Sequence, residues 1–291
     1  MGYRHTESQG WRLLAELFQR GKRIFNIKDA VLAAQGLAIP QSQLKKILFN
    51  LTKYGYLLRL HRGLYVGIGL LPGQINVNPL VISSFLIQPS AISHWSALQY
   101  HGLTEQVPQI ITAITTSKII TPSMRKSYTE KKHSQKKHAW KIAGIHYEYK
   151  KIKKEHFDLG LEKIWIDEQF RIQITDKERT LLDIFVSPQM FGGMGEALGI
   201  LENSLSSVDI KKLVNYAIKY GNKPVIKRLG WALEYFGVPN EIIFPLLNEP
   251  INYYCRLDSS KPAKGPCEKR WMIQNNLIKG KNETIKNKNS N

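Results

Sequence analysis

The stretch PQSQLKKILFNLTKYGYLLRLHRGLYV, residues 40–66, joins two patterns that meet at Gly55. Its second half contains two short β-prone runs, residues 57–60 and 64–66, on either side of His61-Arg62-Gly63. This spacing predicts a tight hairpin with a cationic tip. The first half predicts a helix over residues 40–54, because its apolar residues recur at helical spacing. They are Leu44, Ile47, Leu48, Leu51 and Tyr54.

Two more helices are predicted upstream of this stretch. Residues 26–36, NIKDAVLAAQG, predict a short helix that ends near Gly36. An earlier helix ends at Gly21, and its predicted apolar stripe is Trp11, Leu14, Ala15 and Phe18. Three helices followed by a two-stranded hairpin predict a winged helix-turn-helix domain over residues 1–70.

The outer face of the 40–54 helix carries cations and no acid. At about 100° per residue, the residues opposite the leucines are Ser42, Lys45, Lys46, Phe49 and Lys53. Such a face suits a phosphate-lined major groove, with early polar side chains on base edges and lysines on the backbone. The alternative is a protein-interaction module whose lysines are only solvated. The candidate DNA-binding residues are Gln41, Ser42, Gln43, Lys45, Lys46, Phe49, Lys53, Arg59, His61 and Arg62.

Charge supports a polyanionic partner. The net charge of +19 is concentrated in three basic blocks, residues 1–70, 118–163 and 251–291, separated by two near-neutral ones. A patterned excess of this kind favours nucleic acid. The basic stretch 125–138 is predicted to be an exposed loop or hairpin that either adds a phosphate contact or is a solvated linker, and its role stays open.

Other classes of protein fit the composition poorly. Cys255 and Cys267 are the only cysteines and form no CxxC pair, so neither a disulfide framework nor zinc is expected, and no cofactor or metal is predicted. No secretory signal is apparent, and no run approaches the about 18 apolar residues of a membrane span. We therefore expect a cytoplasmic protein without a membrane partner.

The stretch ISHWSALQYHGLTEQVP, residues 92–108, raises the question of a Ser–His catalytic site. A triad needs an acid to orient its histidine, and the only acid between Asp29 and Glu130 is Glu105. No GxSxG motif is present either. We therefore favour a structural interpretation, in which Ser93 caps a helix that ends at Gly102.

A nuclease is the best enzymatic alternative. Glu148-Tyr149-Lys150 forms an ExK pattern on a predicted strand, as in Mg²⁺-dependent nucleases. Such sites also require an upstream Asp, and none occurs between Asp29 and Asp158. We therefore expect no enzymatic activity. Two alternatives stay open: a metal-dependent nuclease that uses Glu148 and Lys150, and a protein-interaction scaffold that does not bind DNA.

The C-terminal half is predicted to be largely helical. Thr175 and Glu178 have the spacing of a capping box, which we favour over a carboxylate cluster of Asp176, Glu178 and Asp183. Two amphipathic helices follow at about 209–220 and 224–236. Their predicted basic exterior, suited to an acidic partner or RNA, consists of Lys211, Lys212, Lys227 and Arg228.

Three segments in this order resemble the AbiE-type antitoxins of the AbiEi family. They are LLRLHRGLYV (57–66), PLVISSFLIQPSAISHWSALQYHGLTEQVP (79–108) and TDKERTLLDIFVSPQMFGG (175–193). The closing segment also resembles that family at Leu257, Asp258, Gly265, Arg270 and Trp271. The resemblance covers roughly residues 10–275. It implies the transcription regulator of a bacterial type IV toxin–antitoxin system, which acts in abortive phage infection, an antiviral defence.

The resemblance also implies the partners and the mechanism. The N-terminal winged domain would bind double-stranded DNA at an inverted-repeat operator and repress its own promoter, and the C-terminal domain would counter a nucleotidyltransferase-like toxin. The expected fold class is α+β: a winged helix-turn-helix (1–70), then a mixed α/β antitoxin domain (71–275) and a disordered polar tail (276–291). Within the second domain, strands are expected at about 105–175 and helices at about 176–245.

Overall fold

The computed structural model describes residues 3–68, 76–121 and 139–277. The chain forms two compact units. One comprises residues 1–92, 109–152 and 163–173, and the other comprises residues 93–108, 153–162 and 174–291. The basic stretch 125–138 lies outside the described residues. So does the predicted tail, except for Asn276 and Leu277, and Asn276 is buried.

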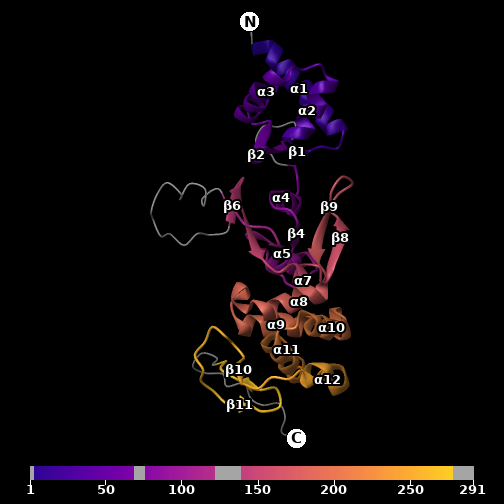
Figure 1. Cartoon of the computed structure of the whole chain (residues 1–291). Helices are drawn as coiled ribbons and strands as arrows, with labels where there is room; N and C mark the ends of the chain where they lie inside the picture. The colour runs from indigo at the N-terminus through magenta and orange to yellow at the C-terminus, as the bar shows by residue number, and fades with distance from the viewer. Residues whose placement is uncertain (1–2, 69–75, 122–138, 278–291) are drawn as a thin grey trace. The chain divides into compact units, whose positions relative to one another are not determined.

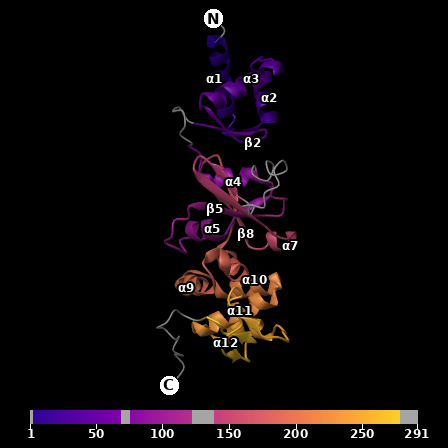
Figure 2. The same cartoon turned by 90° about the vertical axis from the view of Figure 1, so that its left-hand side faces the viewer.

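The N-terminal part of the first unit places three helices against a small antiparallel sheet (Figures 1 and 2). The sheet has the order β1-β3-β2, so the strand that is last in sequence lies in the middle. The elements are α1 (Tyr3–Gln19), β1 (Ile24–Asn26), α2 (Ile27–Gly36), α3 (Gln41–Lys53), β2 (Leu57–His61) and β3 (Leu64–Gly67).

The three helices share one apolar core. The fully buried residues of helix α2 are all alanines, Ala30, Ala33 and Ala34, so its backbone can approach its neighbours closely. Helix α3 contributes four residues at helical spacing, Leu44, Ile47, Leu48 and Leu51. Tyr54 does not join them: it is the C-cap of α3 and is 43% exposed, since the helix ends one residue before it.

The predicted stripe of α1 is confirmed at Leu14 and is wrong at Trp11 and Ala15, which are exposed. Trp11 is exposed and packs edge-on against Tyr56, with ring centroids 4.7 Å apart. Leu13 and Leu17 are buried beside Leu14, and Phe18 is half-buried against the same core. Gly10 lies on the same face, where an added Cβ would lie 3.1 Å from Leu51. The small residue therefore sets the close approach of α1 to α3.

Strand β1 was missed because three residues are too few to show a periodicity. It pairs with β3, where Ile24 lies opposite Val66 and Asn26 opposite Leu64. Asn26 then caps α2, since its side chain accepts hydrogen bonds from the N–H groups of Lys28 and Asp29. The Asp29 carboxylate in turn accepts a hydrogen bond from the N–H of Asn26, which completes a capping box.

The first unit continues into a six-stranded mixed sheet of order β6-β7-β5-β4-β9-β8. Strands β5 and β7 run parallel, with Ile110 opposite His146, and the pairs β4–β5 and β6–β7 are antiparallel. The strands are β4 (Ser90–Ile92), β5 (Ile110–Thr115), β6 (Ala139–Ile142), β7 (Ile145–Lys151), β8 (Leu161–Trp165) and β9 (Arg171–Thr175). Helix α4 (Pro79–Leu86) belongs to this unit, whereas α5 (His94–Tyr100) and α7 (Lys154–Phe157) belong to the second.

The second unit is dominated by helices that enclose its largest apolar core. Helix α8 supplies Leu181, Leu182, Ile184 and Phe185, all fully buried. The helices are α8 (Lys177–Val186), α9 (Met194–Ser204), α10 (Ile210–Tyr220), α11 (Lys223–Tyr235) and α12 (Asn240–Asn248), with the short 3₁₀ turns η1 (Pro188–Phe191) and η2 (Leu205–Ser207).

The predicted basic exterior of α10 and α11 needs one correction. Lys227 is buried, and its Nζ donates to the carbonyl oxygens of Leu246 at 3.3 Å and Leu247 at 2.8 Å. These carbonyls belong to the last turn of α12, where the helix leaves acceptors without an internal partner. Burial lowers the pKa of Lys227. The residue therefore caps a helix inside the unit and does not face an acidic partner.

Three two-residue strands close the described chain: β10 (Cys255–Arg256), β11 (Cys267–Glu268) and β12 (Ile273–Gln274). Leu257, Asp258 and Trp271 are buried here, and the Asp258 N–H donates to Asn276 at 2.8 Å. At Gly265, φ is +118° and a Cβ would lie 2.0 Å from the Asn275 carbonyl oxygen, so only glycine fits.

Within residues 3–68, 76–121 and 139–277, no helix is both long enough and apolar enough to cross a lipid bilayer.

Gly230 provides a direct test of the second core. A Cβ at this position would lie 2.1 Å from the buried Trp271 ring, so Gly230→Ala should displace the indole and lower the free energy of unfolding by about 1–3 kcal/mol. The matched control is Gly199→Ala in α9, where a Cβ meets nothing within 4 Å. This control should raise stability by about 0.5–1 kcal/mol through helix propensity. Urea unfolding measures both, and equal effects would contradict the packing.

Candidate nucleic-acid interface

Helix α3 has two faces of opposite character. Its leucine face is buried, and all seven predicted contact residues on this helix are exposed: Gln41, Ser42, Gln43, Lys45, Lys46, Phe49 and Lys53. Phe49 is 65% exposed despite being apolar. The first turn holds no acidic residue, and the N-cap residue, Pro40, makes no side-chain hydrogen bond to the first N–H groups of the helix. The N-terminal end of α3 is therefore open toward an anion.

The lysines of this face are not neutralised within the described part of the chain. The ion pairs there between residues 9 and 68 join Arg20 to Glu16 at 2.6 Å and Lys22 to Asp29 at 3.1 Å. Neither pair involves α3. Lys53 instead lies 5.9 Å from the ring centroid of the adjacent Tyr54. The positive charge of α3 is thus available to an external partner.

The β2–β3 hairpin presents the remaining predicted residues. Arg59 and Arg62 are exposed, and His61 is half-buried at a register shift in β2. The Arg59 Nε donates to the His61 carbonyl at 3.4 Å. Gly63 turns the chain at φ +82°, and its carbonyl accepts from the Ile27 N–H at 3.1 Å. The tip is therefore tied to the first residue of α2, which fixes its cations relative to the helices.

Further exposed cations of this part were not among the predicted residues. Arg12, Arg23 and Lys28 are exposed, and the sequence pattern did not single them out because they do not share the α3 face. Whether Arg12, Arg23 and Lys28 extend the surface formed by the α3 face depends on the tertiary structure and not on the sequence pattern. Seven of the ten predicted residues lie on α3, Arg59 and His61 lie on β2, and Arg62 lies in the turn between β2 and β3. Helix α3 and strand β2 are joined by a turn at Gly55.

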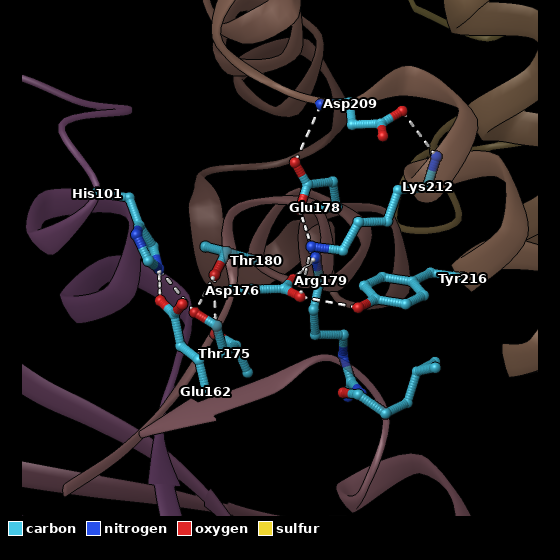
Figure 3. Close-up of polar contacts among 11 residues, drawn as sticks. His101, Glu162, Thr175, Asp176, Glu178, Arg179, Thr180, Asp209, Lys212 and Tyr216 are labelled. Atoms are coloured by element: carbon cyan, nitrogen blue, oxygen red, sulfur yellow. Dashed lines mark hydrogen bonds and ion pairs between the residues drawn. The ribbon is translucent and has the colours of Figure 1, made fainter. Parts of the chain in front are cut away.

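A second polar constellation lies in the helical unit, around the start of α8 (Figure 3). Asp176 is the N-cap and accepts from the Arg179 N–H at 2.8 Å and the Tyr216 hydroxyl at 2.8 Å. Lys212 lies 3.0 Å from Asp176 and 2.8 Å from Glu178. Two carboxylates of α8 therefore share one ammonium from α10.

The predicted capping box is wrong in its residues. Thr175 ends β9 and its hydroxyl hydrogen-bonds to Thr180 at 2.8 Å, while the cap is Asp176. The Glu178 carboxylate accepts from the N–H of Asp209 at 3.0 Å and from the Lys212 Nζ at 2.8 Å. The local spacing could not reveal this, since both of its partners lie about thirty residues later in the chain.

Asp183 belongs to a separate buried pair. Its carboxylate accepts from the Arg179 Nε at 2.9 Å, and both side chains are almost fully buried. Arg179 also donates to the carbonyl oxygens of His156 and Leu159, so it joins α8 to the segment around α7. Asp176, Glu178 and Asp183 therefore do not form one carboxylate cluster. Each is paired with a cation that holds two segments together.

The Ser–His stretch is also structural in its geometry. The Ser93 hydroxyl lies 2.7 Å from the His94 Nδ1, and both residues are buried, whereas Glu105 is exposed. Ser93 occupies the N-cap of α5 but makes no side-chain cap hydrogen bond, which corrects its predicted role. His94, at φ +54°, stacks on Phe191, and the helix ends at Tyr100 rather than Gly102.

The ExK pattern lies on β7, as predicted, with Glu148 opposite Thr112 of β5. The two residues on either side of Glu148, Tyr147 and Tyr149, are buried. Across the described parts of the chain, no three His, Cys, Asp or Glu side chains gather closely enough to hold a metal ion.

Comparisons with known proteins bear on the fold. No protein-family model matches the chain, and no curated protein matches it. The crystal structure of the RV2827C protein from Mycobacterium tuberculosis is similar, with a TM-score of 0.62 at 12% sequence identity. The match covers 93% of this chain and 92% of that chain. At this identity the likeness shows the fold alone, a mixed α+β architecture over nearly the whole length.

Glu178 makes the second unit sensitive to acid. Burial raises the pKa of its carboxyl, but hydrogen bonds from Lys212 and the Asp209 N–H outweigh burial and lower the pKa below 4.5. Because the folded pKa is depressed, this stabilisation is present above pH 4.5 and is lost as the pH falls through the folded value. Glu178→Gln should lower stability by about 1–2 kcal/mol at neutral pH and have little effect in acid.

Urea unfolding between neutral pH and about pH 3 measures this difference. The control is Glu202→Gln at an exposed position of α9, which should leave the pH dependence unchanged. A constant gap between wild type and Glu178→Gln at every pH would contradict the ionic role of Glu178.

Proposed function

We propose that this protein is a DNA-binding transcriptional autorepressor and the antitoxin of a bacterial type IV toxin–antitoxin pair. In this proposal residues 3–67 are a winged helix-turn-helix. Helix α2, the turn at residues 37–40 and helix α3 form the helix-turn-helix, and the β2–β3 hairpin is the wing.

The observation that carries the DNA-binding half is the outer face of α3. It holds three lysines, a hydroxyl and two amides, it is free of acid, and it projects from a helix whose opposite face is fixed by the core. That combination suits a major groove, where polar side chains reach base edges and lysines meet phosphates. Arg59 and Arg62 on the wing suit the flanking backbone or minor groove.

The antitoxin half rests on the resemblance of residues 79–108 and 175–193 to the AbiE-type antitoxins. In this role the mixed sheet and the helical unit counter a nucleotidyltransferase-like toxin encoded beside this reading frame. The polar contacts of α8 support a rigid scaffold for such a task, since Arg179 and Lys212 each join segments distant in sequence.

Charge reversal on α3 tests the DNA-binding half. Lys46→Glu with Lys53→Glu should weaken binding to the DNA upstream of the protein's own reading frame at least about 30-fold near physiological salt, because two phosphate contacts are lost. The slope of log affinity against log salt should fall by about 2. Fluorescence anisotropy over a salt series measures both quantities.

The matched control is Lys163→Glu with Lys211→Glu, which makes the same change in net charge at exposed positions outside the winged region. It should retain affinity within a few fold. Equal losses in the two double variants would mean that net charge, rather than the α3 face, drives binding.

Separating the two activities tests the antitoxin half. When expressed from an unrelated promoter, the Lys46→Glu, Lys53→Glu protein should still protect cells from the product of the adjacent reading frame, because the antitoxin role is assigned to residues 71–275. Its repression of a reporter fused to its own promoter should be lost. Growth and reporter output measure the two effects, and loss of protection by a folded double variant would refute this division of labour.

A further inference from the structure

Phe49 is anomalous on the face where it lies. At 65% exposure it is the most exposed of the large apolar side chains described between residues 9 and 68. Leu44, Ile47, Leu48 and Leu51 already fill the core side of α3, so the fold does not need this ring. A phenyl group also cannot donate or accept a conventional hydrogen bond. Core packing explains the leucines of α3 but does not explain why the Phe49 ring is exposed to solvent.

The surroundings of the ring limit what can cover it. Lys45 and Lys46 precede Phe49 by four and three residues, and Lys53 follows it by four, so all three lie on the same helix face. No described carboxylate pairs with these lysines. A second copy of this face would bring like charges together around the two rings. A polyanion with an apolar group between its charges matches the pattern.

DNA has one such group in its major groove. The thymine C5 methyl is the apolar feature of the base edges there, and protein side chains recognise it by apolar contact. Phosphates run along both sides of the groove, where lysines one turn before and one turn after Phe49 would lie. We infer that Phe49 is a specificity-determining residue whose ring contacts thymine C5 methyl groups. This inference rests on the proposed function and names the base chemistry that its site prefers.

The test compares two forms of one DNA fragment. The segment upstream of the reading frame is amplified once with thymidine triphosphate and once with deoxyuridine triphosphate, which removes every C5 methyl and keeps the hydrogen-bonding edges. Wild type should bind the uracil fragment more weakly, by about 4-fold for each methyl group contacted. Anisotropy titrations at fixed salt measure the affinity ratio.

Variants assign the effect to the ring. Phe49→Ala should bind the two fragments equally, with a lower affinity for the thymine form, and Phe49→Leu should keep part of the preference. The matched control is Leu32→Ala in α2, an apolar side chain of similar exposure, 58%, on a different helix, and it should keep the wild-type ratio. This comparison also corrects for general differences in stiffness between thymine and uracil DNA, because those affect all variants alike.

The outcomes separate the inference from the proposed function. Equal, salt-sensitive binding of both fragments by wild type would overturn the inference and leave the DNA-binding proposal standing. A wild-type ratio that persists in Phe49→Ala would remove Phe49 from recognition. Absence of salt-sensitive binding to either fragment would refute the proposed function and the inference with it.

Discussion

The burial of one face of α3 is the constraint on which the N-terminal part depends. Leu44, Ile47, Leu48 and Leu51 must leave water together, and the core that they share with α1, α2, Phe25 and Leu57 gives them apolar partners. Once that face is fixed, the rotation of the helix is fixed as well. The lysines and Phe49 then have to project outward. The candidate interface is therefore a consequence of core packing rather than an independent feature of the surface.

The second unit depends on a different constraint, because its helical core contains buried charged side chains that need polar partners. Arg179 and Asp183 are both almost fully buried, and burial of an unpaired charge is strongly unfavourable. The guanidinium satisfies its remaining donors on the carbonyls of His156 and Leu159. Lys227 is buried without a carboxylate and uses the last carbonyls of α12 instead. In both cases a cation joins two segments by hydrogen bonds: Arg179 joins α8 to the segment around α7, and Lys227 joins α11 to the end of α12. Apolar packing alone would not specify these contacts.

Sequence reasoning failed where the deciding partner was distant. The spacing of Thr175 and Glu178 matches a capping box, yet Glu178 is taken by Asp209 and Lys212, and Asp176 caps the helix in its place. The stripe of α1 was right at Leu14 and wrong at Trp11, because Trp11 packs on Tyr56 at the margin of the core. Lys227 was expected on the exposed surface of α11, because the sequence does not show that the last carbonyl groups of α12 lie within reach of its ammonium group. Each error comes from a tertiary contact that overrides a local preference.

The sequence by itself determined the order of the three N-terminal helices and the hairpin, the position of α3 within about one residue and the acid-free character of its outer face. These follow from periodicity, which depends only on neighbours along the chain. The tertiary structure decided that β1 joins the hairpin as a third strand and that Gly63 ties the hairpin tip to α2. It also decided that Asp176 and Glu178 share Lys212 while Asp183 pairs with Arg179. Those features depend on which distant groups meet when the apolar faces are buried, and no local pattern specifies such meetings.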